Sequence, residues 1–255
     1  MLGKPCLLNS SARRPNSASL WSRLLLHFWA LGIEQDYSAP RPDGRPYEPH
    51  PIEYLQRAYE QTIEATSKPQ EWHGTTTAAG AQLHYEPVTA GPNEPVKPVL
   101  YITNVGDSQI IVLRPLESKI IYKTEPQWHW FDCPKQLGTN SLDTPEKDAV
   151  MDKVEVEEND VVLAVSDGVI DNLWEHEIVS NVIQSIQEWE LCGNSTATKY
   201  GGGGGMKFVA EQLMNAARII AQDPFAESPY MEHAIEEGLP MEGGTSSESA
   251  LHYFL

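Results

Sequence analysis

Residues 161–172 read VVLAVSDGVIDN, an apolar run that ends abruptly in Ser166, Asp167 and Gly168. A short apolar run bounded by turn residues predicts a buried β-strand over Val161–Val165. Asp167 is then held rigidly at the strand end, and Asp171 follows one turn later. Carboxylates fixed in this way suit hard cations such as Mg²⁺ and Mn²⁺. The alternative is that Asp167 caps a helix beginning near Ile170, a role for which Asp is equally well suited.

Further short runs of β-branched and aromatic residues precede this strand and predict a sheet-rich middle region. These runs are Gln82–Tyr85, Val99–Thr103, Ile110–Leu113, Lys119–Lys123 and Val154–Val156. Within Asp152–Glu157, charged residues alternate with Val, which is typical of a half-exposed strand. We expect this segment to form a hairpin with Val161–Val165 through Glu158, Asn159 and Asp160.

Helical periodicity occurs on both sides of the strands. The expected helices are Ser19–Leu31, with Leu20, Leu24, Phe28 and Leu31 on its apolar face, and then Ile52–Thr66, Glu175–Trp189 and Met206–Ala221. Pro51 stands at a favourable helix-initiating position. The five glycines Gly201–Gly205 predict a flexible loop. Helices that bracket a block of strands indicate an α+β domain rather than alternating βαβ units.

Composition limits the protein class. A chain of 255 residues with 40% hydrophobic residues is expected to fold around one core. Its formal net charge of −18 disfavours a nucleic-acid partner, because phosphate binding needs clustered Lys and Arg. Three cysteines without CxxC spacing indicate a reducing compartment, and the apolar run Leu24–Leu31 is too short to span a membrane. The first 33 residues contain four basic residues and no acid, which is the composition of an organelle transit peptide, but we prefer the interpretation of Ser19–Leu31 as a buried helix.

A second polar segment, Asn104–Ser108 (NVGDS), follows the predicted strand Val99–Thr103. By itself it reads as a Gly-Asp hairpin turn. It lies between HGTTTA (His73–Ala78) and QWHWFDCPKQL (Gln127–Leu137), and ENDVVLAVSDGVIDN (Glu158–Asn172) comes last. In this order the four segments resemble the type 2C metal-dependent protein phosphatases. The Q-x-H-x-F-x-x-P-x-Q-L segment is similar to that of their mitochondrial branch, and the resemblance spans roughly Ser17–Gly244.

The resemblance implies an α+β fold in which a two-sheet antiparallel β-sandwich is flanked by helices. It also implies a serine/threonine phosphatase in which two Mn²⁺ or Mg²⁺ ions activate a water molecule that attacks a phosphoprotein substrate. Asp167 matches a core metal ligand, whereas Asp107 and Asp171 match acids that hold a third, weaker ion. Thr75–Thr77 would support the site, and His129 matches a histidine of the branch without an assigned role. A monomer in mitochondria, or otherwise in the cytoplasm, is expected.

Both ends of the chain depart from the family pattern. Residues 1–16 contain no acid where the first metal motif, an Ala-Asp-Gly-Val-Gly-Gly-Trp-like turn, is expected. Near the other end, Ser247 stands where a second metal-binding aspartate is expected. We therefore expect a chain truncated at both ends, with a phosphatase-like domain over 17–244 between non-matching segments 1–16 and 245–255.

With Asp167 as the retained core ligand, we expect weak metal binding and little turnover by this chain. The alternative function is that of a non-catalytic pseudophosphatase or phosphoprotein-binding module. An unrelated acidic hydrolase is disfavoured because the sequence contains neither G-x-S-x-G nor H-E-x-x-H.

Overall fold

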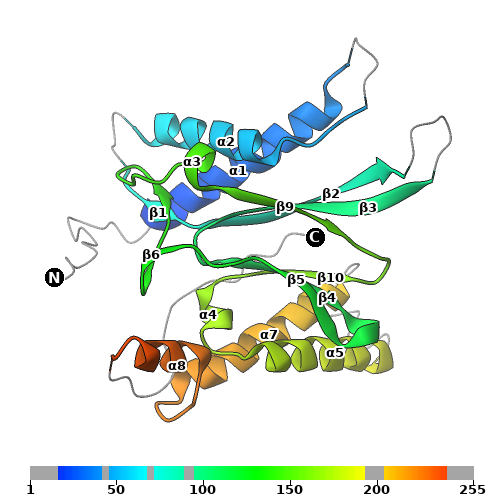
Figure 1. The fold of residues 1–255 in the computed structure, drawn as a ribbon, viewed down its shortest axis with the longest axis vertical. Coiled ribbons are helices and arrows are strands. Elements are labelled where there is room, and N and C mark those ends of the chain that lie inside the picture. Colours follow the sequence, from blue (N-terminus) through cyan, green and yellow to red (C-terminus); the bar gives the residue numbers. More distant parts are fainter. Residues whose placement is uncertain (1–16, 42–45, 68–71, 89–94, 193–203, 240–255) are drawn as a thin grey trace. The chain divides into compact units, whose positions relative to one another are not determined.

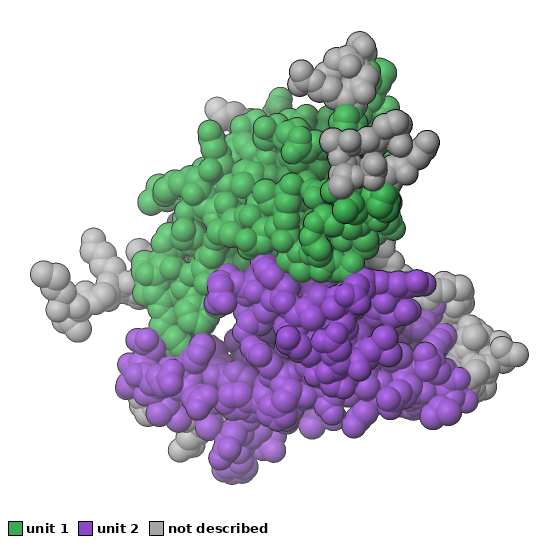
Figure 2. All heavy atoms as spheres, turned by 45° about the vertical axis from the view of Figure 1, so that its right-hand side comes forward, with its two compact units in different colours: residues 1–107, 126–156 green, residues 108–125, 157–255 purple. Residues whose placement is uncertain are grey.

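The computed structural model of the protein describes residues 17–41, 46–67, 72–88, 95–192 and 204–239. These residues form two compact units, which Figure 2 distinguishes by colour. Unit 1 takes its residues from Met1–Asp107 and Pro126–Val156, and unit 2 takes them from Ser108–Glu125 and Glu157–Leu255. The predicted segments 1–16 and 245–255 lie outside the described residues.

Unit 1 combines a three-stranded antiparallel sheet with two long helices (Figure 1). Its elements are α1 (Ser17–Ser38), α2 (Pro51–Thr66), β1 (Thr75–Thr76), β2 (Ala78–Pro87), β3 (Val96–Val105), β6 (Trp128–Trp130), β7 (Cys133–Pro134), β8 (Leu137–Gly138), α3 (Pro145–Asp148) and β9 (Val150–Glu155). The sheet order is β2-β3-β9, and two small antiparallel pairs, β1 with β8 and β6 with β7, accompany it. Helices α1 and α2 lie side by side on one side of the sheet (Figure 1).

The core of unit 1 is formed where α1 and α2 pack together. Trp21, Leu25 and Trp29 are buried on α1, with exposed fractions of 0%, 1% and 6%, and they pack with Tyr54 and Leu55 of α2. The predicted helix is confirmed, but its buried face is displaced by one residue from the expected leucine stripe. The two tryptophans explain the displacement, because burying their large rings removes more apolar surface from water.

Unit 2 combines a second three-stranded antiparallel sheet with helices. Its elements are β4 (Gln109–Arg114), the 3₁₀ turn η1 (Pro115–Glu117), β5 (Lys119–Lys123), β10 (Val161–Val165), α4 (Asp167–Ile170), α5 (Glu175–Cys192), α7 (Gly204–Gln222) and α8 (Pro229–Glu236). The sheet order is β10-β4-β5. Ile111 of β4, Val165 of β10, Ile178 of α5 and Leu213 of α7 share one apolar core. The α+β class with antiparallel sheets and flanking helices is therefore confirmed.

The expected hairpin between Asp152–Glu157 and Val161–Val165 is wrong. Strand β9 pairs with β3, whereas β10 pairs with β4 in the other sheet. The start of β10 is held by Arg114, whose guanidinium donates two hydrogen bonds of 2.8 Å to the Asp160 carboxylate. This fork fixes β10 beside the end of β4, so the connection at Glu158–Asp160 links two sheets.

The prediction that Asn104–Ser108 forms a hairpin turn is also wrong. Strands β3 and β4 belong to different sheets, so Gly106–Ser108 connects two sheets and does not close a hairpin. Burial of β10 is less complete than expected, because it is an edge strand and Val162 is 42% exposed. Of the expected glycine loop, residues 201–203 lie outside the described part of the chain, whereas Gly204 and Gly205 form the first turn of α7.

Among the described residues, no helix is both long enough and apolar enough to cross a bilayer.

Candidate functional site

Two of the sequence motifs in unit 1 meet at the turn that follows β3. Gly106 has a φ of +102°, a left-handed conformation that favours glycine. A Cβ atom at this position would lie 2.4 Å from Cγ2 of Thr77 and 2.7 Å from the Lys135 carbonyl oxygen. Thr77 belongs to the HGTTTA segment and Gly106 to the NVGDS segment. Close contact between them therefore requires glycine at position 106.

Gln127, the first residue of the QWHWFDCPKQL segment, clamps the same turn. Its Oε1 accepts a hydrogen bond of 2.9 Å from the Gly106 amide, and its own amide donates one of 2.9 Å to the Gly106 carbonyl oxygen. Its Nε2 also donates to the Asp148 carbonyl oxygen at 3.0 Å. The half-buried Asp107 follows Gly106 directly, so the clamp fixes the backbone that carries this candidate ligand.

A histidine–aspartate pair lies next to this clamp. His129, on β6, is separated from Gln127 by one residue, and its Nε2 lies 3.0 Å from Oδ2 of Asp143. The Asp143 side chain is 4% exposed, whereas that of His129 is 39% exposed. Oδ2 of Asp143 also accepts a hydrogen bond of 2.9 Å from the Gln136 amide. A buried, anchored carboxylate thus holds one edge of an imidazole ring that remains accessible to solvent.

Asp148 is a buried carboxylate near the clamp. Its Oδ1 pairs with Nζ of Lys135 at 2.9 Å, and its Oδ2 accepts a hydrogen bond from the Thr144 amide at 3.1 Å. Burial favours a higher pKa for Asp148, but these two donors outweigh it and keep the pKa below its usual range. Asp148 therefore serves as a structural anion in unit 1.

Unit 2 carries the other two candidate ligands at the end of β10. Asp167 is the first residue of the short helix α4, with Ser166 at the N-cap position, and Oδ1 of Asp167 accepts a hydrogen bond of 2.7 Å from the Gly168 amide. The helix thus begins at Asp167, three residues before the expected start near Ile170. Asp171 ends this turn: its amide donates to the Asp167 carbonyl oxygen at 2.8 Å. The carbonyl oxygen of Asp171 accepts a hydrogen bond from the Tyr230 amide of α8.

Asp107 belongs to unit 1, and Asp167 and Asp171 belong to unit 2. Across the described ranges, no three or more His, Cys, Asp or Glu side chains are gathered so that they could hold a metal ion. A binuclear Mg²⁺ or Mn²⁺ centre needs several carboxylates in close geometry. The described residues of either unit, taken by itself, therefore do not fit a complete two-ion site.

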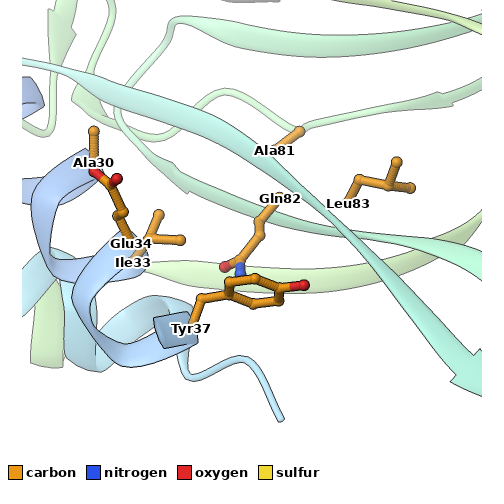
Figure 3. Close-up of a pocket in the computed structure, with 7 residues that line it drawn as sticks. All are labelled: Ala30, Ile33, Glu34, Tyr37, Ala81, Gln82 and Leu83. Carbon is orange, nitrogen blue, oxygen red and sulfur yellow. The ribbon is translucent and has the colours of Figure 1, made fainter. Parts of the chain in front are cut away.

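A shallow groove of about 400 Å³ lies elsewhere in unit 1, between α1 and β2. Figure 3 shows its lining, which is mostly aliphatic and consists of Ala30, Ile33, Glu34, Tyr37, Ala81, Gln82 and Leu83. Nε2 of Gln82 is engaged in a hydrogen bond of 2.6 Å to the Tyr47 hydroxyl. None of the predicted site residues lines this groove, so it is separate from the candidate ligands.

Comparisons with known proteins point to one group of enzymes, although no protein-family model matches the chain. Probable protein phosphatase 2C 26 of Arabidopsis thaliana is 46% identical over 84 residues, which are 33% of this chain and 28% of that protein. Probable protein phosphatase 2C 80 of the same plant is 27% identical over 229 residues, or 89% of this chain and 45% of that protein. The chain thus spans less than half the length of these curated relatives.

A solved structure agrees with these sequence matches. The X-ray structure of the photosystem II phosphatase PBCP is 26% identical and superposes with a TM-score of 0.62. The match covers 89% of this chain and 75% of that one. The sequence matches and this fold match both point to phosphatases.

Proposed function

Because the chain is related in sequence and in fold to the type 2C protein phosphatases, we propose that it hydrolyses phosphoserine and phosphothreonine in proteins. The observation that carries this proposal is the fold match over 89% of the chain to the photosystem II phosphatase PBCP. The chain also contains, in this order, the HGTTTA, NVGDS, QWHWFDCPKQL and ENDVVLAVSDGVIDN segments on which the resemblance rests. Fold alone does not establish activity, so the residues at the ends of β3 and β10 carry the chemical part of the proposal.

Mn²⁺ or Mg²⁺ is the cofactor that this function requires. When bound, such ions neutralise charge on the phosphoryl group and lower the pKa of a coordinated water molecule. We assign Asp167, Asp171 and Asp107 as the ligands that this chain offers. Gln127 supports Asp107 through the Gly106 turn, and the α4 turn holds Asp167 and Asp171 within four residues of each other.

We expect slow turnover by this chain alone. Three carboxylates provide few of the oxygen ligands that two octahedral ions need, and Mg²⁺ dehydrates reluctantly. Millimolar Mn²⁺ is therefore expected to be necessary for measurable hydrolysis.

A non-catalytic phosphoprotein-binding function is the second candidate. The observation that favours it is the absence, among the residues that the structure describes, of a gathered set of three metal-binding side chains. A pseudophosphatase binds a phosphopeptide without releasing phosphate, and EDTA does not change its affinity. An enzyme instead releases phosphate in a manner that EDTA abolishes.

The substrate is proposed at the level of chemical class. A phosphothreonine peptide is therefore a suitable first substrate. The mitochondrial location remains a proposal based on the Q-x-H-x-F-x-x-P-x-Q-L segment. Location of a fluorescent fusion of the whole protein in mitochondria supports it, whereas location in plastids contradicts it.

The test of function is phosphate release from a phosphothreonine peptide in millimolar Mn²⁺, with and without EDTA. A phosphotyrosine peptide of the same sequence serves as the matched control. Release that requires both Mn²⁺ and phosphothreonine supports the proposal. Release from both peptides in EDTA contradicts it.

A further inference from the structure

We propose that unit 1 binds an extended segment of a partner protein, which pairs with the open edge of β2 and packs against α1 in the groove of Figure 3. The segment is apolar at alternate positions and carries Lys or Arg. The proposal goes beyond the phosphatase function and does not depend on it, because none of the candidate metal ligands lines the groove.

Strand β2 is an edge strand without the features that usually protect an edge. It pairs with β3 on one side, and no described strand pairs with its other side. Natural edge strands are commonly protected by charged side chains, bulges or proline. Residues 78–85 contain no Asp, Glu, Lys, Arg or Pro, and the register with β3 is unshifted over the whole strand. The opposite edge strand, β9, carries Asp152, Lys153 and Glu155. Strand β2 is therefore the edge of this sheet that can accept another strand.

The backbone hydrogen bonds show which groups of β2 point to the open edge. The Val88 amide donates to the Pro95 carbonyl oxygen at 2.9 Å, so these residues form a hydrogen-bonded pair. Hydrogen-bonded and non-hydrogen-bonded pairs alternate along an antiparallel ladder. The even-numbered residues of β2 therefore bond to β3, whereas the odd-numbered residues direct their N–H and C=O groups away from it. Ala81 and Leu83 belong to the second set, and both line the groove.

The wall of the groove opposite β2 belongs to α1 and is mostly apolar. Ala30, Ile33 and Tyr37 line it, and Leu83 lies on the β2 side (Figure 3). Tyr37 is 67% exposed and Leu83 is 50% exposed. Successive side chains of a strand point to opposite faces, so alternate side chains of an added segment face α1. Apolar side chains at these positions remove the groove from water, which favours binding.

Charge favours a basic segment. Glu34 lines the groove and is exposed, and no Lys, Arg or His in the described ranges pairs with it. A Lys or Arg of the segment can therefore pair with this carboxylate, and the net charge of −18 attracts a basic segment from a distance. The same net charge disfavours a second copy of this chain as the occupant. The occupant is thus a basic segment of another protein.

The probe is the fluorescein-labelled peptide Gly-Thr-Val-Lys-Val-Lys-Val-Thr-Gly, and its binding to the full chain is measured by fluorescence anisotropy. We expect saturable binding with a Kd of the order of 10–100 μM. Two further peptides carry N-methyl groups on one or the other alternate set of amides. Strand addition uses the N–H groups of one set only. One methylated peptide is therefore expected to bind at least about 10-fold more weakly than the other. Equal affinities of the two, or no saturation up to about 1 mM of the probe, overturn the proposal.

Charge reversal in the groove tests the site of binding. Glu34→Lys is expected to weaken binding of the probe by about 10-fold and to strengthen binding of a peptide in which Glu replaces both Lys residues. Glu64→Lys, at an exposed position of α2 that does not line the groove, is the matched control and is expected to change either affinity by less than about twofold. Urea midpoints verify that both variants fold. Equal effects of the two variants mean that the probe responds to net charge alone, which overturns the proposal.

Amide hydrogen exchange measured by NMR locates the bound peptide without any substitution. The amides of Gly80 and Gln82 bond to β3 and are expected to exchange slowly with and without the probe. The amides of Ala81 and Leu83 are expected to exchange quickly in the free chain and at least about 10-fold more slowly with saturating probe. Unchanged exchange at Ala81 and Leu83 contradicts pairing with β2.

Two other occupants are outcomes of the same measurements. Residues 1–16 contain Lys4, Arg13 and Arg14 and no acid, so this segment can compete for the groove. If replacement of these three residues by Gln in the full chain tightens probe binding by about 10-fold or more, that segment is the occupant and the proposed partner is wrong. A dimer that the probe dissociates in sedimentation experiments identifies a second copy and also overturns the proposal. None of these measurements requires phosphate release, so a negative result leaves the phosphatase proposal unaffected.

Discussion

Gly106 and Gln127 exchange two hydrogen bonds, one from the Gly106 amide to Oε1 of Gln127 and one from the Gln127 amide to the Gly106 carbonyl oxygen, each 2.9 Å long. The residues are 21 positions apart in the chain, so the pair joins the NVGDS and QWHWFDCPKQL segments directly. The pair fixes the turn that precedes Asp107.

Replacement of Gln127 by Ala is expected to destabilise unit 1 by about 1–3 kcal/mol. The change leaves the Gly106 amide and the Asp148 carbonyl oxygen without their side-chain partner, and such groups are costly when removed from water. Urea denaturation monitored by tryptophan fluorescence measures the loss. Gln187→Ala, on the exposed face of α5, is the control and is expected to shift stability by less than about 0.5 kcal/mol. Equal changes in the free energy of unfolding of the two variants would contradict a stabilising role for the Gln127 hydrogen bonds.

Gly106→Ala is expected to cost about 2 kcal/mol or more. Alanine is strained at a φ of +102°, and its Cβ would meet Thr77 and the Lys135 backbone. The matched control is Gly32→Ala in the interior of α1, where a Cβ meets no atom within 4 Å. That change is expected to stabilise the protein by about 0.5–1 kcal/mol, because glycine is a poor helix former. Thermal unfolding of both variants gives the comparison, and the same sign for both would be inconsistent with the structure.

Asp160 is expected to make the stability of unit 2 depend on acid pH. Its two hydrogen bonds from Arg114 hold the pKa of this carboxyl below its usual range. Because the folded pKa is lower than the unfolded value of about 3.9, the stabilisation is present above that value and is lost as pH falls through the folded pKa. The urea midpoint of the wild type is expected to decrease as the pH is lowered from about 5 to 3, and that of Asp160→Asn is expected to decrease less.

The control for this pH dependence is Glu157→Gln. Glu157 also pairs with Arg114, at 2.9 Å, but its side chain is 69% exposed and water screens the interaction. The control should follow the wild-type pH profile closely. If the pH profile is flattened in Glu157→Gln and unchanged in Asp160→Asn, Glu157 causes the pH dependence and the assignment to Asp160 is wrong.

Local patterns in the sequence predicted most of the helices and strands. Lys119–Lys123 and Val161–Val165 are strands with the expected bounds, because β-branched runs and turn residues are local signals. Strand pairing was predicted wrongly, since β9 and β10 are adjacent in the chain and were expected to form a hairpin but pair with β3 and β4. The hydrogen bonds from Arg114 to Asp160 hold the start of β10 beside the end of β4. They join residues that are 46 positions apart, and no local sequence pattern reveals such a contact.

Local sequence patterns also predicted the candidate metal ligands, but they did not predict the residues that support the site through contacts distant in the chain. Asp107, Asp167 and Asp171 follow strands in the sequence, and the structure places them at the ends of β3 and β10. Whether they bind metal remains a prediction. Gln127 and Asp143 were missed, because their partners Gly106 and His129 lie 21 and 14 positions away in the chain. Asp143 lies in a loop whose sequence gives no signal, so only the fold shows that it contacts His129.

The most direct test of the central proposal is the rate of phosphothreonine-peptide hydrolysis by the wild-type chain and by Asp167→Ala, in millimolar Mn²⁺. Asp223→Ala, at an exposed aspartate of unit 2, is the matched control, and urea midpoints verify that all three chains fold. We predict slow hydrolysis that is lost in Asp167→Ala and retained in Asp223→Ala. Hydrolysis that persists unchanged in Asp167→Ala would contradict a metal-dependent phosphatase that uses this aspartate.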